Sequence, residues 1–224
     1  MKSKVTLSLG LLSSALFAEI KTTAEQQIFG SGFTFEDIQS PATNDFGTKA
    51  TWKIISGKID QNSGGIATLY DGKVPSSDDA PRENFFFAAG SNGGLVHVDL
   101  KKSVDLKRIT TYSRHFQNRG PQVFDLYASR SGEPPKGAAD LKNEDWVKLA
   151  SIDTRRPNRS MGGRHAACLT GTIGRFRHLV FDLKPTEKKT PFGLTFFSEI
   201  DIVEADGPEL IFLPNANPAK VIRF

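Results

Sequence analysis

The alternation of apolar and polar residues in the middle of the chain predicts three consecutive β-strands. Each run alternates with a period of two residues, which is typical of an antiparallel strand with one face in the core. The runs are residues 95–100, 106–112 and 122–129. We therefore expect residues 94–131 to form the scaffold of a sheet.

Two polar residues of the first run, His97 and Asp99, admit two interpretations. One is a catalytic or metal-binding pair. The other is a solvated outer face, because polar residues that alternate with Val96 and Val98 are expected on that face in any case. The pattern favours the solvated face.

Similar short apolar runs recur along the chain, and none has a convincing helical period. Short strands separated by turns predict an all-β fold, a β-sandwich. No Pro-rich or Ser-rich linker divides the chain, so we expect one domain at 25–206. The tail at 207–224 is either an edge strand or a contact with another protein. The further strands are expected at 28–38, where the strand is irregular, and at 52–59, 146–152, 166–169, 176–183 and 195–204.

The composition favours a sheet-rich core and argues against binding to nucleic acid. The chain has 224 residues, of which 38% are hydrophobic, so it is long enough to bury a sizeable core. Seventeen Phe against two Met suit the pleated surface of a sheet. The formal net charge of +4 is too small for a nucleic-acid footprint, which needs basic residues concentrated in a patch. We therefore expect no nucleic-acid partner.

The first residues resemble an export signal. Lys2 and Lys4 precede an apolar run at 5–17, which is too short to span a bilayer. Ala18 offers a small residue for cleavage, and Ala24 marks the latest alternative. We therefore expect a signal peptide at 1–18 and a mature protein that is secreted, periplasmic or at the cell surface.

The chain offers no familiar catalytic motif. It lacks a zinc-binding His-Glu-x-x-His, a nucleophile elbow, a phosphate-cradling Gly loop and an obvious carboxylate pair for glycoside hydrolysis. The single Cys168 lies in an apolar run, which indicates a buried, unreactive thiol. His165 is three residues away and falls on the opposite face of a strand, so the two make a poor nucleophile and base. We expect a protein that is not an enzyme.

Two polar loops indicate a binding surface instead. The loop at 113–121 combines side chains that donate or accept hydrogen bonds with Phe116, an aromatic platform. A second, basic loop at 155–165 can meet it. An alternative is that the arginines pair with nearby acids and Phe116 packs inward. The candidate ligand-binding residues are Arg114, His115, Phe116, Asn118, Arg119, Arg164 and His165.

Six short motifs, taken in order, resemble the discoidin-like domains, also called coagulation factor five/eight type C domains, and the related galactose-binding modules. The resemblance covers roughly residues 50–205. The motifs are LYDG at 69–72, VHVDL at 96–100 with ITTY at 109–112, PQVFDLYAS at 121–129, WVKLA at 146–150, FRHLVF at 176–181 and FSEIDI at 197–202.

The resemblance implies a jelly-roll β-sandwich of the galactose-binding type that holds a carbohydrate on loops at one end. A protein or a phospholipid surface is the alternative partner. It also implies a structural calcium ion at Asp71 and Glu199, with Asp78 or Asn84 as a further oxygen ligand, since calcium takes six to eight oxygens. The simpler interpretation is that Asp71 forms a turn and Glu199 is a satisfied edge residue.

Overall fold

The strands of this chain are all antiparallel and belong to one connected network. The structure is a computed structural model that describes residues 20–29, 32–155, 162–187, 194–214 and 220–223, so the expected signal peptide at 1–18 lies outside the described residues. Its elements are β1 (Lys21–Phe29), β2 (Thr51–Ser56), β3 (Gly94–His115), β4 (Val123–Ser129), β5 (Trp146–Asp153), β6 (Gly163–Leu183), β7 (Phe197–Glu204) and β8 (Lys220–Arg223), with the short 3-10 helices η1 (Phe46–Lys49), η2 (Ile66–Leu69), η3 (Pro81–Glu83) and η4 (Asp140–Lys142). The expected all-β fold is confirmed.

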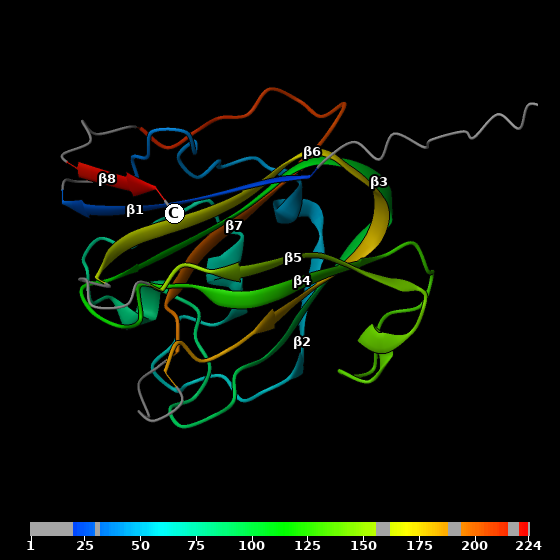
Figure 1. Cartoon of the computed structure of the whole chain (residues 1–224), viewed down its shortest axis with the longest axis horizontal. Helices are drawn as coiled ribbons and strands as arrows, with labels where there is room; N and C mark the ends of the chain where they lie inside the picture. The colour runs from blue at the N-terminus through cyan, green and yellow to red at the C-terminus, as the bar shows by residue number, and fades with distance from the viewer. Residues whose placement is uncertain (1–19, 30–31, 156–161, 188–193, 215–219, 224) are drawn as a thin grey trace, which may run out of the picture.

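Two long strands, β3 and β6, pair along their length and build both layers of a sandwich (Figure 1). The start of β3 pairs with the end of β6, and this half carries β2 on one side and β4 with β5 on the other. The end of β3 pairs with the start of β6, and this half carries β7 on one side and β1 with β8 on the other. We call these the first and second layers. The two strands bend together as they pass from one layer to the other (Figure 1).

The core lies between the two layers. It contains Leu126 and Phe181 from the first layer and Ile109 and Ile200 from the second, each fully buried. Burying a side chain of this size contributes about 1.5–3 kcal/mol, so the sandwich needs no disulfide to be stable. The single cysteine, Cys168, is buried as expected.

A register shift between Leu106 and Arg108 sets the direction of every later side chain of β3. Before the shift Leu106 points into the core, and after it Ile109 does. Because side chains alternate, Tyr112 and Arg114 then lie on the outer face of the second layer. The position of this bulge therefore determines which side chains at the end of β3 face outward.

Both outer faces are partly covered. Phe33, Phe35 and Ile38 pack over Tyr112 and Cys168 on the second layer. On the first layer, Leu141 of η4 packs with Leu95, Trp146 and Val180. His97 lies on this covered face and is only 4% exposed, so the expectation of a solvated residue there was wrong. This face is covered by the loop that follows β4. Because that loop is distant in the sequence, the alternation around His97 cannot predict the cover.

Several predicted boundaries also need correction. Residues 95–100 and 106–112 are parts of one strand, β3, and residues 166–169 and 176–183 are parts of β6. The opening strand expected at 28–38 is instead β1, which ends at Phe29. Residues 25–27 in the middle of β1 are polar, so no apolar pattern marks this strand. Backbone pairing with β6 forms it instead.

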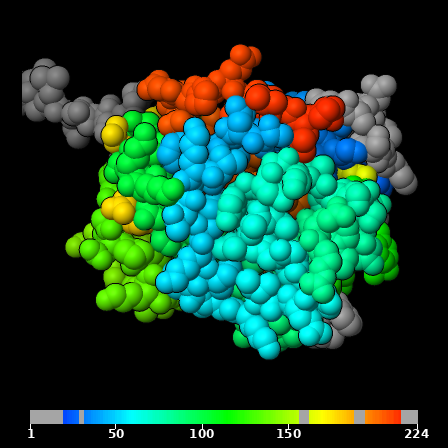
Figure 2. Space-filling view, turned by 180° about the vertical axis from the view of Figure 1, so that it is seen from behind, coloured from blue at the N-terminus to red at the C-terminus, as the bar shows by residue number. Residues whose placement is uncertain are grey.

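The tail joins the sheet. β8 pairs with β1, and upstream of it the amide of Leu213 donates to the carbonyl of Pro41 at 2.9 Å. Of the two alternatives for the tail, the structure shows the edge strand. Figure 2 shows the opposite side of the molecule, where the chain between β2 and β3 spreads over most of the surface.

Candidate functional site

The end of β3 carries two of the predicted binding residues inside the strand rather than in a loop. β3 continues through His115, and Arg114 lies opposite Arg164 of β6 in the ladder. Both arginines face Asp78: Nε of Arg114 lies 2.7 Å from Oδ1, and Nη2 of Arg164 lies 3.6 Å from the same atom. Arg114 also donates to the carbonyl of Pro75. These guanidinium groups hold the 75–78 segment against the sheet.

This arginine pair is buried, and its charge is only partly matched. Arg114 is 8% and Arg164 4% exposed. Burial, and then the charge of Arg114, lowers the pKa of Arg164 from its ordinary value. Nε of Arg164 has no hydrogen-bond partner among the described residues. The pair therefore supports the surface from below and does not itself reach solvent.

His165 is placed away from the surface. It is 1% exposed, and its Nδ1 lies 3.1 Å from the hydroxyl of Thr154. Its carbonyl accepts a hydrogen bond from the Gln122 side chain at 3.1 Å. These contacts make it part of the packing between β4, β5 and β6.

An aromatic stack rises from the core to the surface beside the arginine pair. The ring of Phe196 stacks on Phe86 with centroids 4.1 Å apart, and the ring of His115 meets Phe196 edge-on at 4.9 Å. Phe116 stacks on His115 at 4.6 Å and is 50% exposed. The guanidinium of Arg119 lies 4.7 Å from the centroid of Phe196. We call these five residues the aromatic stack, with Phe116 as its exposed end.

Polar groups surround the exposed end of the stack. Asp79, with a side chain that is 60% exposed, places Oδ1 3.9 Å from Nε2 of His115. Asn118 donates to Oε2 of Glu187 at 3.3 Å. Burial lowers the pKa of His115, so its ring is neutral near pH 7. Of the predicted binding residues, Phe116, Asn118 and Arg119 are therefore the ones that reach the surface.

A second cluster consists of three buried carboxylates, which we call the acidic cluster. Asp45, Glu199 and Asp201 place ligand oxygens within 4.8 Å of one another. Backbone amides bind part of each carboxylate, among them Gly47 to Asp45 at 2.7 Å and Gly72 to Glu199 at 2.9 Å. Oδ2 of Asp45 and Oδ1 of Asp201 have no hydrogen-bond partner within the described part of the chain.

The charge of the acidic cluster is not balanced by the protein. Burial, and then the charges of neighbouring carboxylates, raise the pKa of Glu199 and Asp201 well above the usual range. Burial alone raises the pKa of Asp45, to about 6. The charge of Arg108 lowers the pKa of Asp45 and Asp201 but does not reverse these shifts. Three carboxylates beside one guanidinium need a proton or a cation. The donor set therefore suits a hard cation, which prefers carboxylate oxygens.

The predicted calcium ligands divide between two places. Glu199 is in the acidic cluster, and the charge of the exposed Asp71 raises its pKa, so the two lie near each other. The Asp71 carboxylate accepts from the amide of Lys73 at 3.0 Å, which is the turn-forming role. Asp78 lies instead with the arginine pair. The sequence reasoning missed Asp45 and Asp201, although Asp201 follows Glu199 by two residues and so shares its strand face.

Comparisons with known proteins return structures only, since no family model and no curated protein matches the chain. The module CpGH89CBM32-6, produced by Clostridium perfringens, is 16% identical over 72% of this chain and 100% of its own, with a TM-score of 0.45. CpGH89CBM32-5 from the same organism, in complex with GalNAc-β-1,3-galactose, is 13% identical over 71% and 99%, with a TM-score of 0.46. The lectin domain of lectinolysin, complexed with Lewis B antigen, is 15% identical over 73% and 99%, with a TM-score of 0.47.

These structures are of the kind that the sequence motifs resemble, because CBM32 modules have the discoidin-like, galactose-binding fold. The similarity concerns the fold. At TM-scores below 0.5 it carries no argument about what this chain binds, and the β-sandwich itself rests on the strand pairing described above.

Proposed function

We propose that this chain is a non-catalytic carbohydrate-binding module that holds its ligand at the exposed end of the aromatic stack. The observation that carries the proposal is the exposed ring of Phe116 seated on the buried ring of His115. Sites for small ligands combine an apolar or aromatic surface with a few placed polar groups. The apolar C–H face of a pyranose ring fits such a surface, and its hydroxyl groups fit the polar groups beside it.

The stack is held in place before a ligand arrives. His115 and Phe196 immobilise the base of the stack, and the amide of Phe116 donates to the carbonyl of Asp78 at 3.1 Å. A surface that is already ordered loses little conformational entropy on binding. Of the polar groups beside the stack, we propose that Arg119, Asn118 and Asp79 contact the sugar, with Arg114 and Arg164 as supports beneath. His165 supports the packing farther inside.

Sugar complexes occur among the similar structures, which agrees with the proposal but is not its basis. The test is a glycan array probed with the purified chain, repeated on phospholipid vesicles. We expect retention on one group of glycans and none on vesicles. Retention on vesicles alone, or on neither surface, would favour the alternative of a membrane- or protein-binding module.

The acidic cluster is the basis for a structural cation, and calcium is the ion that we propose. Asp45, Glu199 and Asp201 supply carboxylate oxygens, two of which accept no hydrogen bond from a described residue. A bound cation would neutralise the cluster and tie the turns at Gly47 and Gly72 to β7. Asp71 lies close enough to influence Glu199 and completes the proposed donor set.

The proposed location is outside the cytoplasm, on the strength of the signal-like residues at 1–18. Among the described residues, none forms a helix that is long and apolar enough to cross a membrane. β1 begins at Lys21, so cleavage after Ala18 would leave this strand whole, whereas cleavage after Ala24 would remove its first residues.

A further inference from the structure

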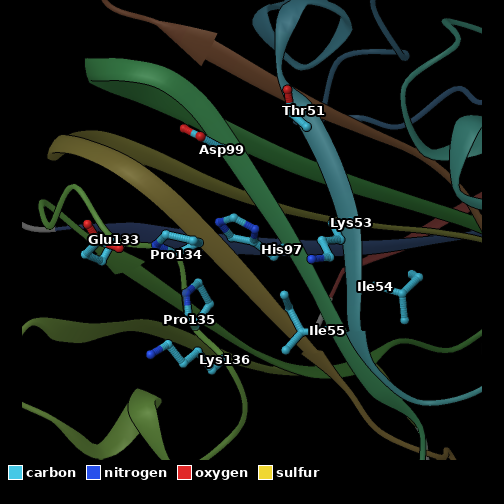
Figure 3. A pocket seen from close by; sticks show the side chains of 10 residues that line it. All are labelled: Thr51, Lys53, Ile54, Ile55, His97, Asp99, Glu133, Pro134, Pro135 and Lys136. Atoms are coloured by element: carbon cyan, nitrogen blue, oxygen red, sulfur yellow. The ribbon is translucent and has the colours of Figure 1, made fainter.

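A cavity lies on the outer face of the first layer, far along β3 from the aromatic stack (Figure 3). Its volume is about 360 Å³, within the range of small-molecule sites. Three parts of the chain line it: β2, the start of β3, and the segment 133–136 that follows β4. We call it the lysine cavity. Its residues are Thr51, Lys53, Ile54, Ile55, His97, Asp99, Glu133, Pro134, Pro135 and Lys136.

The lysine cavity has apolar residues on two sides. Pro134 and Pro135 face Ile55 across the opening (Figure 3). Ile55 packs against the cluster that contains Leu141, so the strand and the covering segment are joined by buried contacts. Proline has a fixed φ and loses little entropy when a ligand orders the wall. Such a wall suits the C–H face of a sugar ring.

The floor of the lysine cavity is made by His97, which is electrically neutral. Its Nε2 lies 3.0 Å from Nδ1 of His178, and both rings are buried. Burial, and then the charge of His178, lowers the pKa of His97 to about 4. Asp99 does not offer a free negative charge, because its two oxygens accept from Nε and Nη2 of Arg177 at 3.0 and 3.2 Å.

The free charge at the lysine cavity is positive. Lys53 and Lys136 form no ion pair with any described residue of the chain. In Figure 3 the Lys53 ammonium reaches toward His97, and Lys53 is one of the charges that lower the pKa of that ring. Glu133 is the remaining acid of the lining. It also forms no ion pair with a described residue, and its charge acts on Arg177 and His178. The two unpaired ammonium groups therefore outnumber the one unpaired carboxylate, and an anionic ligand beside His97 would meet Lys53.

From this arrangement we infer that the lysine cavity binds an acidic sugar residue, a hydroxylated ring that carries a carboxylate. The ammonium group of Lys53 binds the carboxylate, and the proline and isoleucine side chains pack on the ring. Lys136, at the other end of the lining, adds positive charge (Figure 3). The hydroxyl of Thr51 is available to the ring hydroxyl groups. The inference rests on the proposed function for the sugar class, and it adds a separate site with a preference for charge.

The experiment is calorimetric titration of the chain with a trisaccharide of galacturonic acid. The matched neutral probe is the trisaccharide of galactose, and sodium acetate tests the carboxylate alone. The variants are Lys53→Met and Lys136→Met, which keep much of the apolar stem. Lys58→Met is the control, because Lys58 is exposed just beyond the end of β2 and outside the cavity. Phe116→Ala separates this site from the aromatic stack.

We expect the uronate trisaccharide to bind wild type, Lys58→Met and Phe116→Ala alike. Lys53→Met should raise its Kd about tenfold or more, since a charge-assisted hydrogen bond is lost, and Lys136→Met should raise it less. Uronate binding that Phe116→Ala abolishes and Lys53→Met leaves unchanged would overturn this inference while supporting the proposed function. Acetate binding as tight as that of the trisaccharide would show a general anion site and would also overturn it. So would equal affinity for the neutral trisaccharide, or no binding of the uronate.

Discussion

The Nε2 atom of His97 on β3 lies 3.0 Å from the Nδ1 atom of His178 on β6, and both residues are buried. Only one proton can lie between these two atoms, so one ring donates and the other accepts. Oδ1 of Asp99 lies 3.7 Å from Nδ1 of His178. The pair is thus a buried, neutral link between the two central strands of the first layer.

This link should make stability depend on pH. The pKa of His97 falls from 6.5 to about 4 on folding, through burial and the charges of His178 and Lys53, which outweigh Asp99. Between these values the unfolded chain binds a proton that the folded chain does not, so stability present above pH 6.5 is lost as pH falls toward 4. The contribution is on the order of 3 kcal/mol.

Urea unfolding of wild type and His97→Gln at pH 7, 5.5 and 4 measures this contribution. We expect the stability difference between the two proteins to shrink as the pH falls, because only wild type loses the neutral histidine. A difference that stays constant or widens toward pH 4 would contradict the lowered pKa of His97.

Removal of the exposed ring should weaken glycan binding without loss of stability. Phe116 is 50% exposed, so Phe116→Ala removes the platform and leaves the core intact. We expect at least a tenfold weaker retention in affinity electrophoresis and an unchanged Tm, with a loss of about 1–2 kcal/mol of binding energy. Val147→Ala is the control, because Val147 is also 50% exposed but lies on β5. Equal weakening of glycan retention in both variants would contradict the proposed role of Phe116 as the platform.

Calcium should stabilise the fold through the acidic cluster. At a free concentration of 100 Kd, a cation that binds only the folded chain adds about 2.7 kcal/mol. We expect a higher Tm in calcium than in EDTA for wild type. Asp201→Asn should lose this rise in Tm. Asp105→Asn should keep it, because the wild-type Asp105 carboxylate pairs with the exposed Arg175 instead. A Tm that is the same in calcium and EDTA for wild type would argue against the ion.

Gly93 should tolerate no side chain at the entry to β3. Its φ is +86°, and a Cβ there would overlap the carbonyl oxygen of Leu183. Gly90 has a similar φ of +73° but open space around it. We expect Gly90→Ala to cost about 1 kcal/mol of unfolding free energy through φ alone and Gly93→Ala to cost clearly more. Denaturant melts of the two variants separate the steric effect from the conformational one. Equal losses of unfolding free energy would contradict the predicted steric overlap at Gly93.

The resemblance and the apolar alternation were sufficient for the fold class but not for the site. Val96, Val98 and Leu100 lie in the core as the period of two predicts. The predicted loop residues Arg114 and His115 proved to be buried strand residues, because β3 pairs with β6 through His115. The half-exposed Phe116 was the one large apolar residue that the sequence marked as a platform and the structure leaves at the surface.

What the sequence determined by itself is the set of apolar faces, since side-chain alternation is a local property of an extended chain. Only the tertiary structure decided which polar residues meet. Asp45 reaches Glu199, Pro134 reaches the cavity beside His97, and Asp78 reaches Arg114 across long separations in the chain. These encounters depend on strand register, on one bulge in β3 and on the loops that cover each layer, and none of these follows from a repeat of two residues.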